Sequence, residues 1–480
     1  CLLFDPLRPR PLSIPLVVLF SGGIRACSGG GGGGAAEEEG MEREPVLLVS
    51  GMGGSILNAR SKKKSKFEIR VWVRILLANL EFKKYLWSIY NPDTGYTESL
   101  DPDVEIVVPE DDYGLYAIDI LDPSLFVKCS HLTDVYHFHD MIEMLIKCGY
   151  KKGTTLFGYG YDFRQSNRTD KAMDGLKMKL QAAYKASGGK KVNIVSHSMG
   201  GLLVQCFMSL HADVFKKYIN KWICIACPFQ GAPGCINDSL LTGLQFVYGF
   251  ESFFFVSRWN MHQLLVECPS IYEMLPNANF KWKQLPLVLV WRKQSGETEE
   301  VELEEFDATK CASLFEEALR NNELNYNGKS VALPFNFEIF KWAADTRQIL
   351  DKAQLPNTVS FYNIYGISFD TPFDVCYGSE TSPIGDLSEV CHTMPEYTYV
   401  DGDGTVPAES AKADGFAATA RVGIKATHRG LLKDERVFQL LKQWLGVSEK
   451  SQQRHSTLSS KVMDMFSEPA PVHLASRDLF

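Results

Sequence analysis

The sequence predicts an α/β fold with a mostly parallel central sheet, helices on both faces and an inserted cap and lid region. Short apolar runs of strand length occur, for example, at residues 46–49, 192–195 and 359–367, and the second of them leads into a helical pattern. A serine stands at a tight turn after the second run, and a carboxylate and a histidine follow downstream. This is the chain order of the α/β-hydrolase fold, whose sites lie at the carboxyl edge of the sheet.

The first predicted strand, residues 46–49, ends in a loop of sequence Ser-Gly-Met-Gly-Gly. In acyl transfer, backbone N–H groups stabilise the negative charge that develops on the carbonyl oxygen. We expect one such N–H from Met52, with Gly53 beside the substrate. The alternative is a glycine-rich turn without a ligand. A phosphate-binding loop is excluded, because no lysine follows at the required spacing.

The second predicted strand leads into Ser-His-Ser-Met-Gly at residues 196–200 and then into an apolar helical pattern. Strand, turn and helix together predict a nucleophile elbow with Ser198 at its apex and the Met199 N–H as second oxyanion donor. Such a strained turn requires small residues two positions before and after the serine. Gly200 fits, and Ser196 replaces the usual glycine. An ordinary turn is the alternative interpretation.

Three aspartates are candidates for the acid that orients the histidine. Asp401 and Asp403 lie in Asp-Gly-Asp-Gly-Thr-Val, and Asp370 precedes Thr-Pro, which favours a turn. His428 follows Asp403 by 25 residues, past a strand-like run at 421–425. We therefore expect a Ser-His-Asp site made of Ser198, His428 and one of these carboxylates.

The Asp-Gly-Asp-Gly sequence also resembles the beginning of an EF-hand loop. Counted from Asp401, the sixth and twelfth positions are Val406 and Lys412. Calcium loops require glycine and glutamate there, so this interpretation fails. The sequence predicts no metal and no cofactor.

Further motifs carry a family resemblance over residues 45–445. They include Gly-Tyr-Gly-Tyr-Asp-Phe-Arg at 158–164, the elbow, residues 228–233 and the aspartate motif at 401–406. The chain resembles lecithin:cholesterol acyltransferases and lysosomal phospholipase A2, and more closely the plant lecithin:cholesterol acyltransferase-like phospholipases. The resemblance implies that Asp403 is the acid, that Met52 is the first oxyanion donor, and that Tyr161 lies beside the acyl groove. A buried pair of Asp162 with Arg164 is the structural alternative for that segment.

Two insertions are expected to approach the lipid. Residues 57–101 contain no cysteine, although the animal secreted relatives have a disulfide-closed lid there. Basic residues at 60–66 precede a tryptophan- and leucine-rich stretch at 72–87, which predicts a helix lying in a lipid headgroup layer; a solvated loop plus a core helix is the alternative. The cap, residues 235–355, is rich in aromatic residues. Of these, Phe250 and Phe254 are expected to line an acyl groove or to close the core of the cap.

The composition limits the function further. A formal net charge of -8 argues against a nucleic-acid partner. The sequence contains no run of 18 apolar residues, so no membrane-spanning helix is predicted. Several of the twelve cysteines fall in apolar strand or helix patterns, which indicates buried thiols in a reducing compartment. We expect a cytoplasmic protein that contacts membranes peripherally. The sequence gives no indication of an oligomeric state.

The predicted organisation has five parts. Residues 1–40 form a disordered or untranslated-type extension, with Met41 as a natural start and a signal peptide as the alternative. The hydrolase core comprises residues 41–234 and 356–447, separated by the cap, and residues 448–480 form a flexible tail.

The resemblance implies a serine lipid acyl hydrolase of phospholipase A type that acts on glycerophospholipids. An acyltransferase is the alternative, since the acyl-enzyme could be discharged to a sterol or a diacylglycerol instead of water. A non-catalytic lipid-binding protein is a further alternative, against which the complete set of serine, aspartate and histidine counts.

Overall fold

Six parallel strands form the central sheet, in the order β17-β14-β9-β8-β1-β7. Their bounds are β1 (Val46–Val49), β7 (Leu156–Tyr159), β8 (Val192–His197), β9 (Ile219–Ile225), β14 (Ser360–Gly366) and β17 (Ala420–Ile424). Strands β1, β7 and β8 are buried on both faces, as their continuous apolar sequence requires. The computed structural model describes residues 43–63, 68–74, 82–130, 133–247, 257–293 and 300–448. The extension at 1–40 and all but the first residue of the tail lie outside the described residues.

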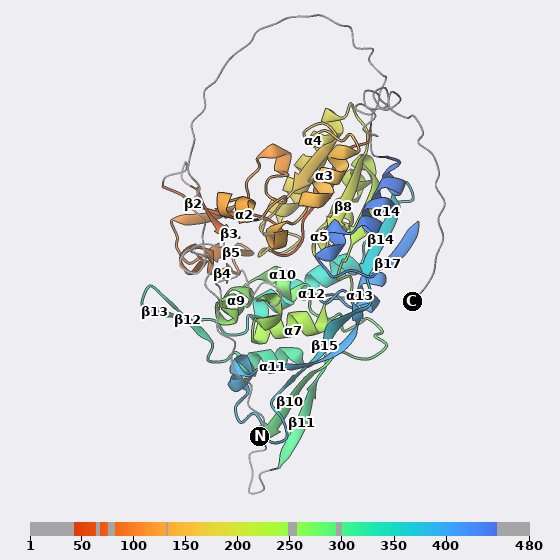
Figure 1. Cartoon of the computed structure of the whole chain (residues 1–480). Coiled ribbons are helices and arrows are strands. Elements are labelled where there is room, and N and C mark those ends of the chain that lie inside the picture. The colour runs from red at the N-terminus through yellow and green to blue at the C-terminus, as the bar shows by residue number, and fades with distance from the viewer. Residues whose placement is uncertain are drawn as a thin grey trace, which may run out of the picture. The chain divides into compact units, whose positions relative to one another are not determined.

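Helices cover both faces of this sheet, as Figure 1 shows. Alternate side chains of a strand point to opposite faces. Accordingly, Leu47 and Val49 pack in one hydrophobic cluster, and Val46 and Leu48 pack in another. The first cluster includes α4 (Asp170–Ala186), α5 (Gly200–Leu210) and α6 (Ala212–Tyr218), and the second includes α3 (His139–Lys147) and α14 (Glu435–Leu445). The prediction of an α/β fold with a mostly parallel sheet is confirmed.

The chain between β9 and β14 forms the cap. Its elements are α7 (Pro233–Leu241), α8 (Leu244–Val247), α9 (Arg258–Leu265), α10 (Pro269–Tyr272), β10 (Val288–Lys293), β11 (Val301–Phe306), α11 (Cys311–Ala318), β12 (Glu323–Tyr326), β13 (Lys329–Ala332) and α12 (Phe337–Asp351). Helix α12 contacts α5 of the core, where Gln205 Nε2 donates to the Leu350 carbonyl at 3.0 Å. The cap is therefore packed directly on the helix that follows the predicted elbow.

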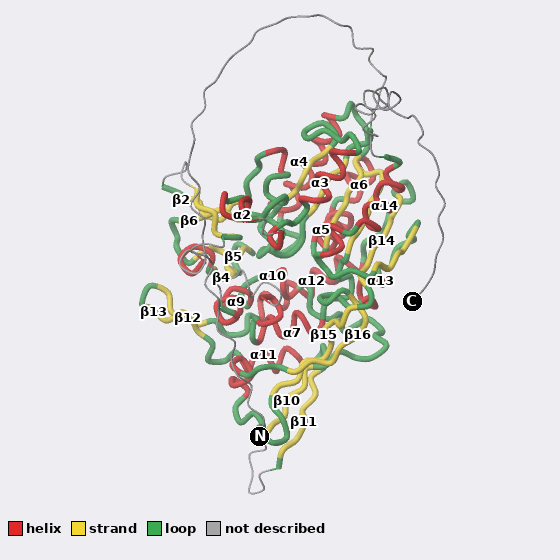
Figure 2. The backbone as a smooth tube through the Cα atoms, viewed as in Figure 1, coloured by secondary structure: helices red, strands yellow, loops and turns green. Residues whose placement is uncertain are grey.

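A second sheet joins the cap to the chain beyond it. Strand β10 pairs in parallel with β15 (Phe369–Tyr377), which pairs antiparallel with β16 (Glu396–Gly402). The resulting order is β11-β10-β15-β16, and Figures 1 and 2 show these strands extending away from the central sheet. Strands β11 and β10 precede residue 355, the predicted end of the cap, and β15 and β16 follow it, so this sheet contains strands from both sides of that boundary.

The segment predicted as a lid, residues 57–101, belongs to two small sheets, one of which also includes a strand just beyond it. Strands β2 (Leu57–Ser61), β3 (Glu68–Trp72) and β6 (Val104–Val107) form one, and β4 (Ser88–Asn91) and β5 (Tyr96–Ser99) form a hairpin after the short helix η1 (Phe82–Leu86). The side chains of Trp72 and Trp87 are 3% and 4% exposed. Their indole N–H groups donate to the carbonyls of Gly53 and Asn260. The prediction of an interfacial helix anchored by these tryptophans is therefore wrong for the described part of this segment.

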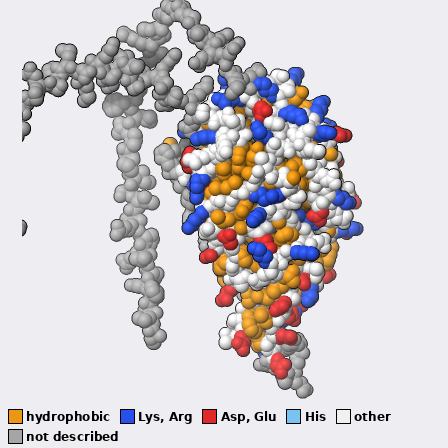
Figure 3. Space-filling view, turned by 90° about the vertical axis from the view of Figure 1, so that its right-hand side faces the viewer, with side chains coloured by type: hydrophobic (Ala, Val, Ile, Leu, Met, Phe, Trp, Pro, Cys, Tyr) orange, Lys and Arg blue, Asp and Glu red, His pale blue; other side chains and the backbone are white. Residues whose placement is uncertain are grey.

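The remaining short elements are η2 (Asp112–Gly114), α2 (Leu125–Ser130), η3 (Thr133–Val135), η4 (Leu387–His392), α13 (Ala408–Lys412) and η5 (Gly430–Lys433). In the part of the chain that the structure describes, no helix is long and apolar enough to span a bilayer. Figure 3 shows one face of the molecule, on which hydrophobic side chains lie between acidic and basic ones.

Candidate active site

Ser198 lies at the turn between β8 and α5. Its φ of 54° is in the left-handed region, which a non-glycine residue rarely adopts. The turn is held by a hydrogen bond from the Ser198 N–H to the Ile225 carbonyl at 2.8 Å. A Cβ atom on Gly200 would collide with the backbone of Ser50, so this position requires glycine. Ser196 is accommodated because its hydroxyl accepts a hydrogen bond from the Trp222 indole at 2.9 Å.

A chain of hydrogen bonds connects three of the predicted site residues. Ser198 Oγ lies 2.8 Å from His428 Nε2, and His428 Nδ1 lies 2.7 Å from Asp403 Oδ2. The other carboxylate oxygen of Asp403 accepts the N–H groups of Thr405 and Val406 at 2.9 and 2.7 Å. A carboxylate accepts only, so the Nδ1 proton of His428 is directed to Asp403 and Nε2 is left to accept from the serine hydroxyl.

The structure brings neither of the other two aspartates to His428. Asp401 and Asp370 lie opposite each other on β16 and β15, and both are exposed. Asp401 accepts the Ser368 N–H. The turn expected at Asp370 lies instead at Ser368, whose φ is 65°, because Asp370 is already in β15.

The two predicted oxyanion donors belong to adjoining loops. A Cβ atom on Gly51 would lie 2.8 Å from Ser198 Cβ and 3.3 Å from the Met199 nitrogen, so the loop after β1 touches the elbow. Within the described residues, neither the Met52 nor the Met199 N–H has a hydrogen-bond acceptor. Two free backbone donors beside a nucleophile are what an oxyanion hole requires.

A cavity of about 170 Å³ adjoins Ser198. The described residues that line it are mostly apolar: Met52, Gly53, Gly54, Trp72, Val73, Leu121, His137, His197, Ser198, Pro228, Ala232, Cys235, Ile236, Gln245, Ile271, Met274, Thr405, Val406, His428 and Arg429. Gly53 thus lines the cavity that adjoins Ser198, and its contact with the substrate stays a prediction. Phe250 and Phe254 lie outside the described residues.

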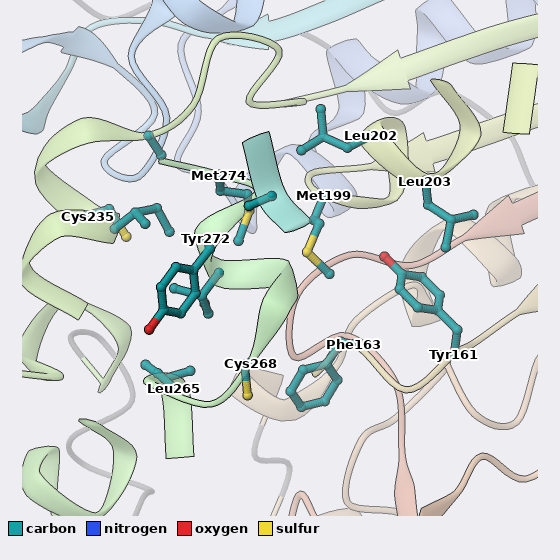
Figure 4. Packing of buried hydrophobic residues seen from close by; sticks show 14 of the residues in the cluster. Tyr161, Phe163, Met199, Leu202, Leu203, Cys235, Leu265, Cys268, Tyr272 and Met274 are labelled. Carbon is teal, nitrogen blue, oxygen red and sulfur yellow. The ribbon is translucent and has the colours of Figure 1, made fainter. Parts of the chain in front are cut away.

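Tyr161 is not brought to this cavity. Its ring is 6% exposed and stacks on Tyr159 at 6.0 Å between centroids, and its N–H donates to the Ser55 hydroxyl. Figure 4 shows it in the buried cluster that also contains Met199 and Leu203. Tyr161 lines a different cavity, of about 620 Å³, together with Tyr159 and Arg164. Its place beside the acyl groove stays a prediction. The expected pair of Asp162 with Arg164 is present at 2.7 Å.

Two histidines that were not predicted from the sequence lie next to the site. His197 Nε2 donates to the His428 carbonyl at 3.0 Å, and the His137 ring lies 5.5 Å from the His197 ring. Burial, and then the positive charge of Arg429, lower the pKa of His137 to about 3. Burial, and then His428, hold the pKa of His197 well below its usual range. Both rings are therefore neutral at physiological pH. The position of His197 beside the nucleophile was a signal available in the sequence, whereas His137 belongs to no motif.

The sequence profile described as "Lecithin:cholesterol acyltransferase" matches residues 83–415. The Arabidopsis thaliana protein named Phospholipase A(1) LCAT3 is 69% identical over 425 residues, covering 88% of this chain and 95% of that protein. The human Lysosomal phospholipase A and acyltransferase is 28% identical over 204 residues, covering 39% of this chain and 47% of that protein.

Solved structures show the same fold. The crystal structure of the Tle4-Tli4 complex contains a chain with a TM-score of 0.50 and 15% identity, covering 84% of this chain and 98% of that one. At this identity the similarity concerns the fold alone.

Proposed function

The chain belongs to the lecithin:cholesterol acyltransferase family, and on that premise we propose that it is a serine phospholipase of type A. It cleaves fatty-acyl esters of glycerophospholipids through an acyl-enzyme on Ser198. The observation that carries the proposal is the hydrogen-bonded chain from Ser198 through His428 to Asp403. The 69% identical relative, named a phospholipase A(1), supports the substrate class.

In the proposed reaction, Ser198 Oγ attacks the ester carbonyl while His428 Nε2 takes the hydroxyl proton. Asp403 stabilises the imidazolium that forms, and the Met52 and Met199 N–H groups bind the oxyanion. The tetrahedral intermediate collapses, His428 returns the proton to the leaving glycerol oxygen, and a lysophospholipid departs. A water molecule, activated by His428, then attacks the acyl-enzyme and releases the fatty acid.

The function is tested with purified protein and a phospholipid labelled separately in each acyl chain, with and without a sterol. We expect equal amounts of fatty acid and lysophospholipid, and the labels identify which ester is cut. The rate should be unchanged in excess EDTA, because the side chains and N–H groups of the site account for every step. Transfer of label to the sterol would identify an acyltransferase. Lipid binding without any product would identify a non-catalytic protein.

We also propose peripheral contact with anionic lipid through Lys62, Lys63 and the neighbouring Lys64 and Lys66, of which the last two lie outside the described residues. Lys62 and Lys63 support this because they lie at the end of β2, and the Lys63 side chain is 74% exposed. Each lysine near an anionic surface contributes about 1 kcal/mol. The contribution of Lys63 should be smaller, because Asp103 pairs with it at 2.6 Å.

Replacing these four lysines with glutamine should weaken binding to anionic vesicles at low salt and reduce its dependence on salt. Hydrolysis of a short soluble ester should be unaffected. The matched control replaces four exposed lysines elsewhere: Lys281, Lys283, Lys341 and Lys352. Vesicle flotation measures binding, and equal losses in the two variants would show that only net charge matters.

A cytoplasmic location is proposed on the basis of the cysteines. The ten in the described residues are all free thiols, and most are buried. Location of a tagged full-length chain in an oxidising compartment would contradict this proposal.

A further inference from the structure

The three side chains of the site are also connected through the backbone. The His428 N–H donates to the carbonyl of Asp403 at 2.8 Å. The His428 carbonyl accepts a hydrogen bond from His197 Nε2 at 3.0 Å, and His197 directly precedes Ser198. The peptide groups on both sides of His428 are therefore hydrogen-bonded to the segments that carry Asp403 and Ser198.

His197 has the properties of a fixed hydrogen-bond donor. It is the last residue of β8 and is 2% exposed. A carbonyl oxygen only accepts, so the proton of the His197 ring is on Nε2. Burial, and then His428, hold the pKa of His197 well below its usual range, so the ring stays neutral and keeps this single N–H. Its Nδ1 atom is buried and has no partner in the part of the chain that the structure describes. The bond to His428 is thus the hydrogen bond that the ring is placed to make.

Packing fixes the direction of this N–H. The centroid of the His197 ring lies 4.8 Å from that of the His428 ring. The rings of His137 and Phe138 lie 5.5 and 6.5 Å from it. The backbone is enclosed as well, since a Cβ atom on Gly51 would lie 2.7 Å from the His197 carbonyl. With neighbours at both ring and backbone, the side chain has little room to turn its N–H away from His428.

His428 needs such an anchor because it comes from a loop. Its Nε2 lies 2.8 Å from Ser198 Oγ and its Nδ1 lies 2.7 Å from Asp403 Oδ2, and both distances have to be kept at once. The residue belongs to the connection between β17 and η5, and groups on loops are placed less precisely than groups on strands or helices. A displacement of about 1 Å can lower a reaction rate by about 100-fold. A bond to the backbone of His428 restricts the loop at the residue where precision matters.

We propose that His197 is a positioning residue, which fixes the backbone of His428 and thereby keeps the imidazole of His428 between Ser198 and Asp403. The inference rests on the proposed serine mechanism. It assigns to His197 no part in the proton transfers, which stay with His428.

Two substitutions separate the hydrogen bond from the packing of the ring. His197→Met replaces the imidazole with an apolar side chain of similar size and removes the donor. We expect kcat for a short soluble ester to fall about 10- to 100-fold, because His428 loses its position, while KM stays within about 2-fold of the wild-type value. His197→Gln has an amide N–H that can reach the position of the imidazole Nε2, so this variant should recover most of the lost kcat.

His262→Met is the matched control. His262 is also buried, and its Nε2 is hydrogen-bonded to Asn322 Nδ2 at 3.0 Å, but it lies in α9 of the cap. A loss of stability from removing a buried imidazole should appear in both variants as a lower Tm, whereas the loss of kcat should be confined to His197→Met. An unchanged kcat in His197→Met, equal losses of kcat in the two variants, or a loss that His197→Gln does not recover would overturn the proposal.

A measurement on the wild-type protein keeps the inference testable if the variants do not fold. The nitrogen chemical shifts of a histidine ring, measured by NMR, distinguish its two neutral tautomers. His197 should be the Nε2–H tautomer, and a proton on Nδ1 alone would overturn the proposal, because Nε2 could not then donate to His428. A wild-type protein that hydrolyses the short ester but no phospholipid would instead contradict the proposed function, and the role of His197 would stand, since both esters use the same three side chains.

Discussion

Ser198→Ala abolishes phospholipid hydrolysis, with an expected loss in kcat of at least about 10⁴-fold, because the attacking oxygen is removed and only binding and oxyanion stabilisation remain. The fold should persist. Alanine adopts a φ of 54° at no greater energetic cost than serine, and the substitution removes only the hydroxyl that is hydrogen-bonded to His428. Hydrolysis is measured with a purified labelled substrate, and thermal unfolding should give a Tm within a few degrees of the wild type.

A covalent probe provides the control for this variant. A fluorophosphonate should label the wild-type protein at Ser198 and should not label Ser198→Ala. Retention of more than a few per cent of the activity in a preparation free of contaminating esterases would show that another residue is the nucleophile.

Asp403→Asn should reduce kcat by a factor on the order of 10⁴, because an amide in this place favours the wrong tautomer of His428 and does not stabilise the imidazolium. The geometry should be retained, since the asparagine oxygen can still accept the N–H groups of Thr405 and Val406. Asp401→Asn is the matched control: the same chemical change two residues away, at an exposed position that bonds to the Ser368 N–H. The kcat of Asp401→Asn should stay within about 2-fold of the wild-type value, as is usual for a surface substitution. The opposite ranking of the two variants would identify Asp401 as the acid.

The sequence specifies the elbow well, because its geometry is local. A β-branched strand, a serine between small residues and an apolar helix lie within about twenty consecutive positions, so Ser198 and Met199 are predicted without knowledge of any distant contact. The choice between Asp401 and Asp403, in contrast, depends on a contact with a residue distant in the sequence. Both residues fit the local pattern, and what separates them is the approach of His428, whose N–H bonds to the Asp403 carbonyl.

Burial of aromatic residues explains why the prediction of an interfacial helix in the lid fails. Tryptophan has an apolar ring and one N–H donor, a combination that suits a headgroup layer and a protein core equally. Trp87 is buried in the core, where its indole N–H donates a hydrogen bond to the carbonyl of Asn260, a residue far away in the sequence. A contact between residues as far apart in the sequence as Trp87 and Asn260 cannot be recognised from a local pattern.

The shared sheet of β10, β15 and β16 limits how this enzyme could be recombined with its relatives. A cap that is connected to the rest of a protein only at its two ends could be exchanged between homologues together with its preference for a substrate. Here the cap strand β10 is hydrogen-bonded to β15, and β16, the next strand of that sheet, ends at Gly402, one residue before Asp403. A chimera cut at the two ends of the cap would pair β10 with a foreign β15. The interchangeable unit therefore has to extend through β16, to within one residue of the acid of the site.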